Sequence, residues 1–498
     1  MADLFERLIV VRPAAEVTLK SKRTRERFMR ALRSSVQDAL QRNGLRCRVR
    51  RRPSRLFVYI EEGPLEVAEE ALGRVFGVGT YSPVRATCTA DPAAIAEAGH
   101  AAFAHLIAGR SFAVRAKRLG QHAFSSMDVA RELGAALVRY GPVDLDTPEF
   151  EVRVEVLNDR AYLFEARLPG PGGLPAGTES RALALISGGY DSAVASWQVL
   201  RRGVELEFVL FNLGGAAYER MVAQVVKLLA DRWCHGARPS LYVVDFAPAL
   251  DDLRANARED YWQVLLKRLM YRAASQLAGR LACEALVTGE SIGQVSSQTL
   301  TNLRVIEGAS GLPVLRPLVG VDKREIMKQA ELVGTEVLSA RVHEYCAIAS
   351  GRPVVAADPD VVDRQESRLD GQLATRAVDR ARELKLRALE PSDLMLPYLF
   401  VDSIPDAAVV LDCQSEHHRR AWHLPGSLHR DPAELVRSPR SLDKGRSYVL
   451  YCAHGMQSAH AAEVLQQLGY EAYSFRGGTL ALRRRVENDQ RQPDAGAV

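Results

Sequence analysis

The sequence predicts a multidomain protein that joins small α+β domains in its first third to α/β domains in the rest. Three observations predict this architecture. The chain has 498 residues with 47% hydrophobic content, which is more than one ordinary domain uses. A Pro/Gly-rich run at residues 168–178 interrupts it, as a linker would. Beyond this run, apolar strand-like segments alternate with helical ones, which is the order of a doubly wound parallel sheet.

The first domain is expected at residues 1–62 and to be ferredoxin-like. Strands are predicted at 8–12, 45–51 and 55–60, with a helix at 24–42. Between Lys20 and Arg55 the chain carries fourteen lysines and arginines, opposed only by Glu26 and Asp38. Clustered cations of this kind favour a nucleic-acid partner, because they release counterions when they meet phosphates. The alternative is a solvated helix face with acidic neighbours in the fold.

The remaining domains follow from the periodicity. Residues 63–168 are expected to form a second α+β domain, with helices at 92–108 and 126–139. Residues 177–346 are expected to form the doubly wound domain, with strands at 181–186, 206–212, 240–245 and 285–288. A charged, mostly helical connector is predicted at 347–402, a final α/β domain at 403–485, and a flexible tail at 486–498.

Several classes of protein are not expected. The chain lacks the ~20 uninterrupted apolar residues that cross a bilayer, and its start lacks the layout of a signal peptide, so a cytoplasmic protein without a membrane partner is predicted. The seven cysteines show no Cys-x-x-Cys spacing, so neither a structural metal site nor a disulfide scaffold is expected. The adjacent His417 and His418 lack a third ligand, so no metal residues are assigned.

A glycine-containing loop is the strongest local signal for chemistry. Ser187-Gly188-Gly189-Tyr190-Asp191-Ser192 follows the apolar run Leu183-Ala-Leu-Ile186 and opens a helix. Backbone N–H groups in such a loop can close around a phosphate at the positive end of the helix. A glycine turn alone is equally typical of a tight strand-to-helix turn. The complete string, however, resembles the PP-loop of ATP pyrophosphatases, which have an adenine nucleotide alpha hydrolase-like fold and leave AMP on the substrate.

Further segments are similar to one PP-loop family, the tRNA 4-thiouridine synthases, or ThiI family of tRNA sulfurtransferases. The segments are Phe211-Asn-Leu-Gly-Gly-Ala-Ala217, Leu265-Leu-Lys-Arg-Leu-Met270, Thr288-Gly-Glu-Ser-Ile-Gly-Gln-Val-Ser-Ser-Gln-Thr-Leu-Thr-Asn-Leu303, Leu315-Arg-Pro-Leu318 and Glu344-Tyr-Cys346. The resemblance implies an ATP site and two residues, Asp191 and Lys323, that assist adenylation. The implied ATP-binding residues are Leu185, Ile186, Ser187, Gly188, Gly189, Asp191, Ser192, Lys267, Gly289 and Gln298. Read alone, Lys267 is also compatible with a surface lysine and Gln298 with an ordinary loop residue.

The N-terminal half resembles the RNA-binding part of the same family. Phe112-Ala-Val-Arg-Ala-Lys-Arg118 with Phe124-Ser-Ser126 is similar to a THUMP domain, and the basic segment before it resembles the ferredoxin-like domain that precedes THUMP there. Such a module holds tRNA by phosphate contacts and shape rather than by reading base edges. The candidate phosphate ligands are Lys20, Lys22, Arg115, Lys117 and Arg118. For any one of them, a passive surface charge is the alternative.

The C-terminal segment resembles a rhodanese domain. Leu411-Asp-Cys-Gln-Ser-Glu416 and Trp422-His-Leu-Pro-Gly426 are similar to its start, and Val449-Leu-Tyr-Cys452-Ala-His-Gly-Met-Gln-Ser458 to its active-site loop. A cysteine in a strand-to-helix loop meets converging N–H donors that stabilise a thiolate and then a persulfide. Cys452 is therefore the predicted persulfide carrier, with an inert core cysteine as the alternative. The resemblance makes Cys346 its disulfide partner, whereas Cys47, Cys88, Cys234, Cys283 and Cys413 are expected to be structural.

Together these resemblances imply ATP-dependent thiolation of uridine U8 in tRNA. They imply ATP with Mg²⁺, a cysteine desulfurase that loads Cys452, and a Cys346–Cys452 disulfide after sulfur transfer, whether the persulfide attacks directly or sulfide is released. A second role as sulfur donor to a carrier protein for thiamine thiazole synthesis is also implied. The alternatives are an ATP-independent sulfur carrier or thiosulfate sulfurtransferase with a passive RNA-binding half, and an RNA-binding module with a degenerate nucleotide fold.

Overall fold

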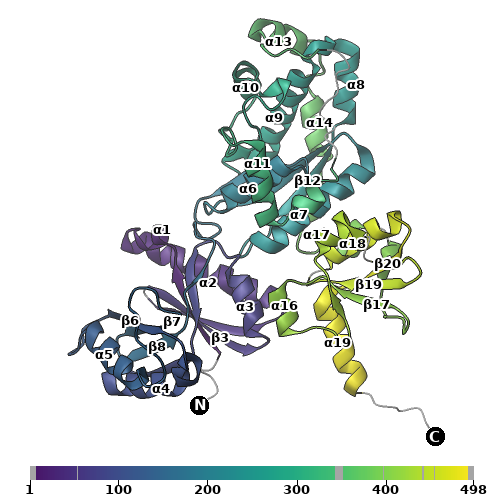
Figure 1. Cartoon of the computed structure of the whole chain (residues 1–498). Coiled ribbons are helices and arrows are strands. Elements are labelled where there is room, and N and C mark those ends of the chain that lie inside the picture. Colours follow the sequence, from purple (N-terminus) through teal and green to yellow (C-terminus); the bar gives the residue numbers. More distant parts are fainter. Residues whose placement is uncertain are drawn as a thin grey trace. The chain divides into compact units, whose positions relative to one another are not determined.

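The computed structural model describes residues 7–52, 54–342, 352–395, 397–439, 442–453 and 455–491. The chain divides into two compact units, Met1–Pro175 and Ala176–Val498. Figure 1 colours the first unit purple to blue and the second teal to yellow. Among the described residues, no helix is both long enough and apolar enough to span a membrane.

The first unit begins with a five-stranded antiparallel sheet. Its order is β2-β3-β1-β4-β9, with strands β1 (Leu8–Pro13), β2 (Arg46–Arg52), β3 (Arg55–Glu62), β4 (Val78–Pro83) and β9 (Leu168–Pro169). Its helices are α1 (Ala15–Thr18), α2 (Lys22–Arg42) and α3 (Leu65–Leu72). Helix α2 forms because Phe28, Leu32 and Val36 recur every four residues and bury one apolar stripe.

This sheet extends beyond the boundary expected at residue 62. Strand β4 comes from the following segment, and β9 pairs with it from the start of the Pro/Gly-rich run. Gly170 N and Gly172 N then donate to Gly79 O and Val78 O, both at 2.9 Å. The Pro/Gly-rich run therefore begins as an edge strand, where a proline removes no hydrogen bond of the sheet. Proline and glycine are also typical of linkers, so the sequence alone predicts a linker here.

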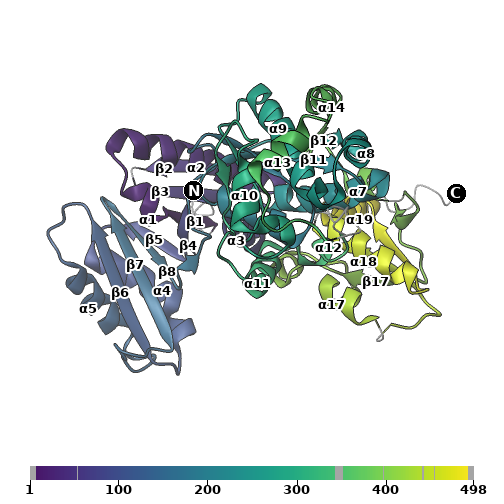
Figure 2. The same ribbon diagram turned by 90° about the horizontal axis from the view of Figure 1, so that it is seen from above.

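The second sheet of this unit has the order β5-β8-β7-β6. Its strands are β5 (Ala86–Thr89), β6 (Phe112–Leu119), β7 (Phe150–Leu157) and β8 (Arg160–Phe164), and β6 pairs with β7 in parallel. Figure 2 shows α4 (Pro92–Ile107) and α5 (Ser126–Leu137) on one face of it. Phe103, Phe112 and Leu133 are buried between sheet and helices. Alternate residues of β6 consequently point away from this core.

The second unit opens with the predicted doubly wound sheet, in the order β14-β13-β10-β11-β12-β15. The parallel strands are β10 (Arg181–Leu185), β11 (Glu205–Asn212), β12 (Ser240–Asp245), β13 (Ala285–Val287) and β14 (Val314–Leu315). Its helices include α6 (Tyr190–Leu200), α7 (Gly215–Trp233), α8 (Ala247–Asn256), α9 (Trp262–Arg280), α10 (Leu300–Glu307), α11 (Lys323–Val333) and α12 (Glu336–Ser339). The chain adds β11 on one side of β10 and β13 on the other. This switch point leaves a crevice at the carboxyl ends of the two strands, where α/β proteins bind ligands.

Residues 352–385 of the segment expected to be a separate connector belong to this domain, which corrects that part of the prediction. Helices α13 (Pro359–Glu366) and α14 (Leu373–Asp379) place Val362, Leu373 and Val378 in the same core as β10 and α9. Strand β15 (Arg382–Lys385) then extends the sheet antiparallel to β12. The charged composition of the segment reflects the exposed sides of these elements. The short helix α15 (Pro391–Leu394) follows.

The last domain is a parallel five-stranded sheet in the order β16-β20-β19-β17-β18. The strands are β16 (Phe400–Val401), β17 (Val409–Asp412), β18 (Leu428–His429), β19 (Ser447–Tyr451) and β20 (Glu471–Phe475), and the helices α16 (Glu416–Ala421), α17 (Pro432–Arg437), α18 (Met456–Gln467) and α19 (Gly478–Arg491). Helix α19 runs past residue 486, where the sequence predicts a flexible tail. Polar helix formers such as Arg, Glu and Gln continue it at that point. Residues 492–498 lie outside the described part.

Candidate functional site

The loop after β10 has the shape predicted for a phosphate-binding turn. Gly188 adopts φ +80°, and Gly189 caps α6. Ser192 Oγ accepts from Ser187 N at 3.3 Å and donates to Gly189 O at 3.1 Å. Tyr218 OH, from α7, donates to Ser187 O at 3.1 Å. These bonds hold the loop against the first turn of α6, at the positive end of the helix dipole.

A cavity of about 200 Å³ opens beside this loop at the switch point. The predicted ATP residues that line it are Leu185, Ile186, Ser187, Asp191, Ser192, Lys267, Gly289 and Gln298. Gly188 and Gly189 lie in the same loop and shape it. Gly289 is required by a close approach, because a Cβ there would lie 2.5 Å from the carbonyl carbon of Asp191. The structure thus gathers onto one crevice residues that are up to 113 positions apart (298 − 185).

Asp191 and Lys323, predicted to assist adenylation, are in direct contact. Lys323 Nζ lies 2.8 and 2.9 Å from the two Asp191 carboxylate oxygens. Gln294 Nε2 donates to the same carboxylate at 3.0 Å. Lys323 is the first residue of α11, whose N-terminus is capped by the Asp322 side chain. The pair places a cation and an anion together at the edge of the cavity.

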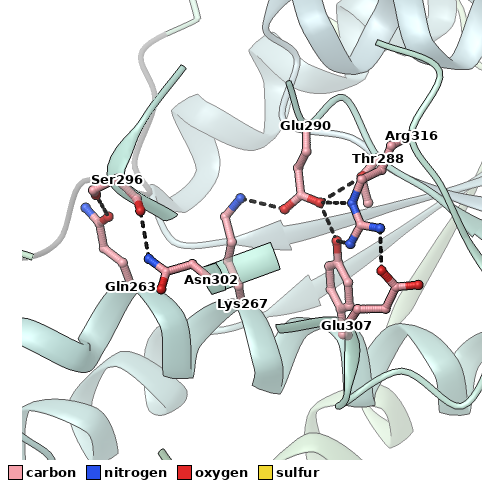
Figure 3. Close-up of polar contacts among 9 residues, drawn as sticks. Gln263, Lys267, Thr288, Glu290, Ser296, Asn302, Glu307 and Arg316 are labelled. Carbon is pink, nitrogen blue, oxygen red and sulfur yellow. Dashed lines mark hydrogen bonds and ion pairs between the residues drawn. The ribbon is translucent and has the colours of Figure 1, made fainter. Parts of the chain in front are cut away.

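Three side chains at this site were not predicted from the sequence, namely Gln294, Tyr271 and Glu290. Glu290 directly follows Gly289 and is only 5% exposed, and its carboxylate contacts Lys267 Nζ at 2.8 Å (Figure 3). A signal was present, because Glu290 stands inside the quoted segment that follows the β13 strand. Its burial, however, depends on contacts with distant residues that the sequence does not reveal.

Cys452 follows β19 and is 3% exposed. Its sulfur accepts from Ser458 N at 3.4 Å and from Ser458 Oγ at 3.3 Å, and Ser458 Oγ lies 2.9 Å from Ser474 Oγ. Helix α18 begins immediately after Gly455, which adopts φ +78°. One N–H and one O–H donor thus reach the sulfur at a helix N-terminus, where such donors can stabilise a thiolate. The persulfide role of Cys452 stays a prediction. His454 lies outside the described residues.

Cys413 directly follows β17, the strand that neighbours β19. Its backbone N donates to Tyr451 O at 2.8 Å, next to Cys452. Burial raises the pKa of Cys413 well above its ordinary value. Such a thiol stays protonated, in keeping with the structural role expected for it. Cys346 and the Glu344-Tyr-Cys346 motif lie outside the described residues, so the Cys346–Cys452 pairing stays a prediction.

The five candidate tRNA ligands are distributed over the two sheets of the first unit. Lys20 and Lys22 are exposed at the start of α2. Arg115 and Lys117 are exposed on the side of β6 that faces away from the helices, and Arg115 Nε pairs with Glu151 at 3.2 Å. Arg118 alternates to the other side, where it is half-buried and donates to His122 O at 3.4 Å. Arg118 is therefore less available to a phosphate than the other four.

Known protein families match four segments of the chain. Family models match the ThiI ferredoxin-like domain at residues 8–82 and the THUMP domain at 91–164. A model described as thiamine biosynthesis protein (ThiI) matches residues 177–370, and a rhodanese-like domain matches 400–484. These matches and the sheets described above confirm the predicted fold classes.

Curated relatives match nearly the whole chain. A tRNA sulfurtransferase of Pyrobaculum aerophilum is 38% identical and covers 94% of this chain and 96% of its own length. One of Pectobacterium atrosepticum is 34% identical, covering 93% and 98%. Among solved structures, a 4-thiouridine synthetase in complex with RNA and ATP is 28% identical. It covers 76% of this chain and 99% of its own, with a TM-score of 0.68.

Proposed function

The chain belongs to the tRNA sulfurtransferase family, and from this premise we propose that it uses ATP to convert U8 of tRNA into 4-thiouridine. The observation that carries the proposal is the cavity at the switch point. It combines a phosphate-type loop, a lysine in its wall and the Asp191–Lys323 pair at its edge. The similar synthetase whose crystals contain RNA and ATP supports the choice of both ligands.

In the proposed first step, the uridine O4 attacks the α-phosphorus of ATP and pyrophosphate leaves. Backbone N–H groups of residues 187–192 bind the phosphates, and Lys267 neutralises part of their charge. Lys323, held by Asp191, supplies a second cation where negative charge develops. Asp191 also offers a carboxylate oxygen, the ligand type that Mg²⁺ prefers, and Mg²⁺ would neutralise phosphate charge when bound with the nucleotide. The product is an adenylated base.

In the second step, a persulfide on Cys452 provides the sulfur. A cysteine desulfurase is the proposed donor. The terminal sulfur either attacks C4 of the adenylated base, or leaves as sulfide when the Cys346 thiolate attacks the Cys452 sulfur. In the first route the new C–S bond displaces AMP and joins the base to Cys452 through a disulfide, and the Cys346 thiolate then attacks the Cys452 sulfur to release the thiolated base. In the second route the released sulfide attacks C4 and displaces AMP. Both routes end in a Cys346–Cys452 disulfide, which an external thiol must reduce before the next turnover.

The first unit is the proposed tRNA-holding part. Lys20, Lys22, Arg115 and Lys117 offer exposed cations for phosphates, and a THUMP match covers the sheet that bears the latter two. A further proposed role is to donate sulfur to the adenylated C-terminus of a carrier protein for thiamine thiazole synthesis. The description of the matched family model supports this role, and radiolabelled sulfur reaching such a carrier from loaded Cys452 would test it.

The test of the main proposal is thiolation of unmodified tRNA by the purified full-length chain. The reaction contains ATP, Mg²⁺, cysteine and a desulfurase, and absorbance near the thiouridine band is followed. We expect product with the complete mixture and none when ATP is omitted. Transfer of sulfur from Cys452 to small acceptors without any ATP-dependent tRNA product would instead support the sulfur-carrier alternative.

A further inference from the structure

We propose that Glu290 is a positioning residue for ATP, which holds the Lys267 ammonium in the wall of the nucleotide cavity. This inference rests on the function proposed above. Both residues line the cavity, Lys267 from α9 and Glu290 from the loop after β13. Lys267 Nζ and Glu290 Oε1 are 2.8 Å apart.

The Glu290 carboxylate is itself held on its other oxygen. Oε2 accepts from Tyr271 OH at 2.6 Å, from Thr288 Oγ1 at 3.1 Å and from Arg316 Nε at 2.9 Å. Figure 3 shows Lys267 on one side of the carboxylate, with Thr288 and Arg316 on the other. Three donors on one oxygen fix the carboxylate plane, so that Oε1 has one direction in which to hold a cation. That direction is occupied by Lys267.

The surrounding charges keep Glu290 ionised. Burial raises the pKa of its carboxyl, but Lys267, Tyr271 and Arg316 outweigh burial and lower it to about 2. Arg316 also pairs with a second carboxylate, because its NH1 donates to Glu307 at 2.7 Å. The four side chains Lys267, Glu290, Arg316 and Glu307 therefore balance in charge, and the Glu290 charge is matched to Lys267.

This arrangement prepares Lys267 for an anionic ligand. A lysine side chain has a long flexible stem, and a ligand that must first order it binds more weakly. Glu290 has already ordered the ammonium at the cavity wall before ATP arrives. A residue with this role acts on ATP only through Lys267, which distinguishes it from one that merely supports the fold.

A double-mutant cycle measured by direct ATP binding tests the inference. Equilibrium binding of ATP to the full-length chain is compared for wild type, Glu290→Gln, Lys267→Ala and the double variant. We expect Glu290→Gln to weaken ATP binding about tenfold, or about 1.4 kcal/mol. In the Lys267→Ala background, the same change is expected to have less than a twofold effect. Affinity for tRNA stays unchanged in every variant.

The matched control is Glu307→Gln. Like Glu290→Gln, it removes one carboxylate that pairs with Arg316, but Glu307 is half-exposed and has no contact with Lys267 in the described structure. It is expected to bind ATP within twofold of wild type. If Glu290→Gln does not fold, judged by its thermal transition and by persulfide loading of Cys452, Tyr271→Phe replaces it. That variant removes one donor and is expected to weaken binding two- to threefold only when Lys267 is present.

Two outcomes overturn the inference alone. The first is a Glu290→Gln variant that binds ATP as tightly as wild type. The second is a Glu290→Gln change that weakens ATP binding equally in the wild-type and Lys267→Ala backgrounds. Wild type that binds ATP normally but does not thiolate tRNA would refute the proposed function and leave the positioning role standing. A wild-type chain that does not bind ATP would refute both.

Discussion

The hydroxyl of Ser458 is expected to control how fast Cys452 takes up sulfur. This residue is fully buried, and among the described residues its Oγ and N are the two donors to the Cys452 sulfur, at 3.3 and 3.4 Å. Ser458→Ala removes the hydroxyl and keeps the backbone donor. A hydrogen bond to a charged group contributes about 1.5–3 kcal/mol, so thiolate-dependent loading should slow by roughly tenfold to a hundredfold.

The assay is single-turnover persulfide formation on Cys452, with desulfurase and cysteine as donor, followed by mass spectrometry. The control is Ser474→Ala, which removes the hydroxyl 2.9 Å from Ser458 Oγ and leaves both donors to Cys452 in place. Ser474→Ala should load within about threefold of wild type. Pyrophosphate release with tRNA should be unchanged in both variants, because that step uses the other site. A folded Ser458→Ala variant that loads as fast as wild type would refute this account of the loop.

Three other predictions address the nucleotide site, the first unit and the RNA surface. Lys323→Ala should lower the thiolation rate on the order of a hundredfold while ATP binding stays within about threefold; an equal loss of ATP affinity would contradict its role in the reaction step. Glu155→Gln should destabilise the first unit by about 3–5 kcal/mol in urea unfolding, because Glu155 is fully buried and accepts from Arg12 Nε at 2.8 Å and Arg55 Nε at 3.0 Å. Burial raises the pKa of Glu155, but the two arginines outweigh burial and hold it below its usual value. Its stabilisation is therefore complete above the unfolded-state pKa and is lost as the pH falls through the lower folded-state pKa; an unchanged acid profile in Glu155→Gln would disprove this. Lys117→Ala should weaken tRNA binding and reduce the slope of log affinity against log salt by about 0.7–0.9; a loss with an unchanged slope would exclude a phosphate contact.

The sequence was sufficient where a motif and its chemistry are local. Ser187–Ser192 and Cys452 each follow an apolar strand and precede a helix within a few residues. The strand, loop and helix around each of them could therefore be predicted from the order of the residues alone. The parallel, doubly wound character of the sheet around β10 could also be predicted, because alternating strands and helices allow few topologies.

What the sequence did not reveal depends on pairing between distant segments. Strand β15 joins the six-stranded sheet of the second unit from a charged stretch 137 positions after the end of β12 (382 − 245). Strand β9 pairs with β4 although all strands of the second sheet lie between them in the sequence. The role of Glu290 was hidden for the same reason. Its partners Lys267, Tyr271 and Arg316 approach from other elements, and only their convergence makes a buried acid stable.

The proposed reaction is tested most directly by separating its two chemical steps in the Cys452→Ala variant. Pyrophosphate release and thionucleoside formation are measured together on the same unmodified tRNA, with ATP, Mg²⁺ and the desulfurase system. If Cys452 carries the sulfur, wild type yields both products, whereas Cys452→Ala releases pyrophosphate in a tRNA-dependent manner and forms no thiouridine. Thiouridine formed at the wild-type rate by Cys452→Ala would contradict the claim that this cysteine carries the sulfur.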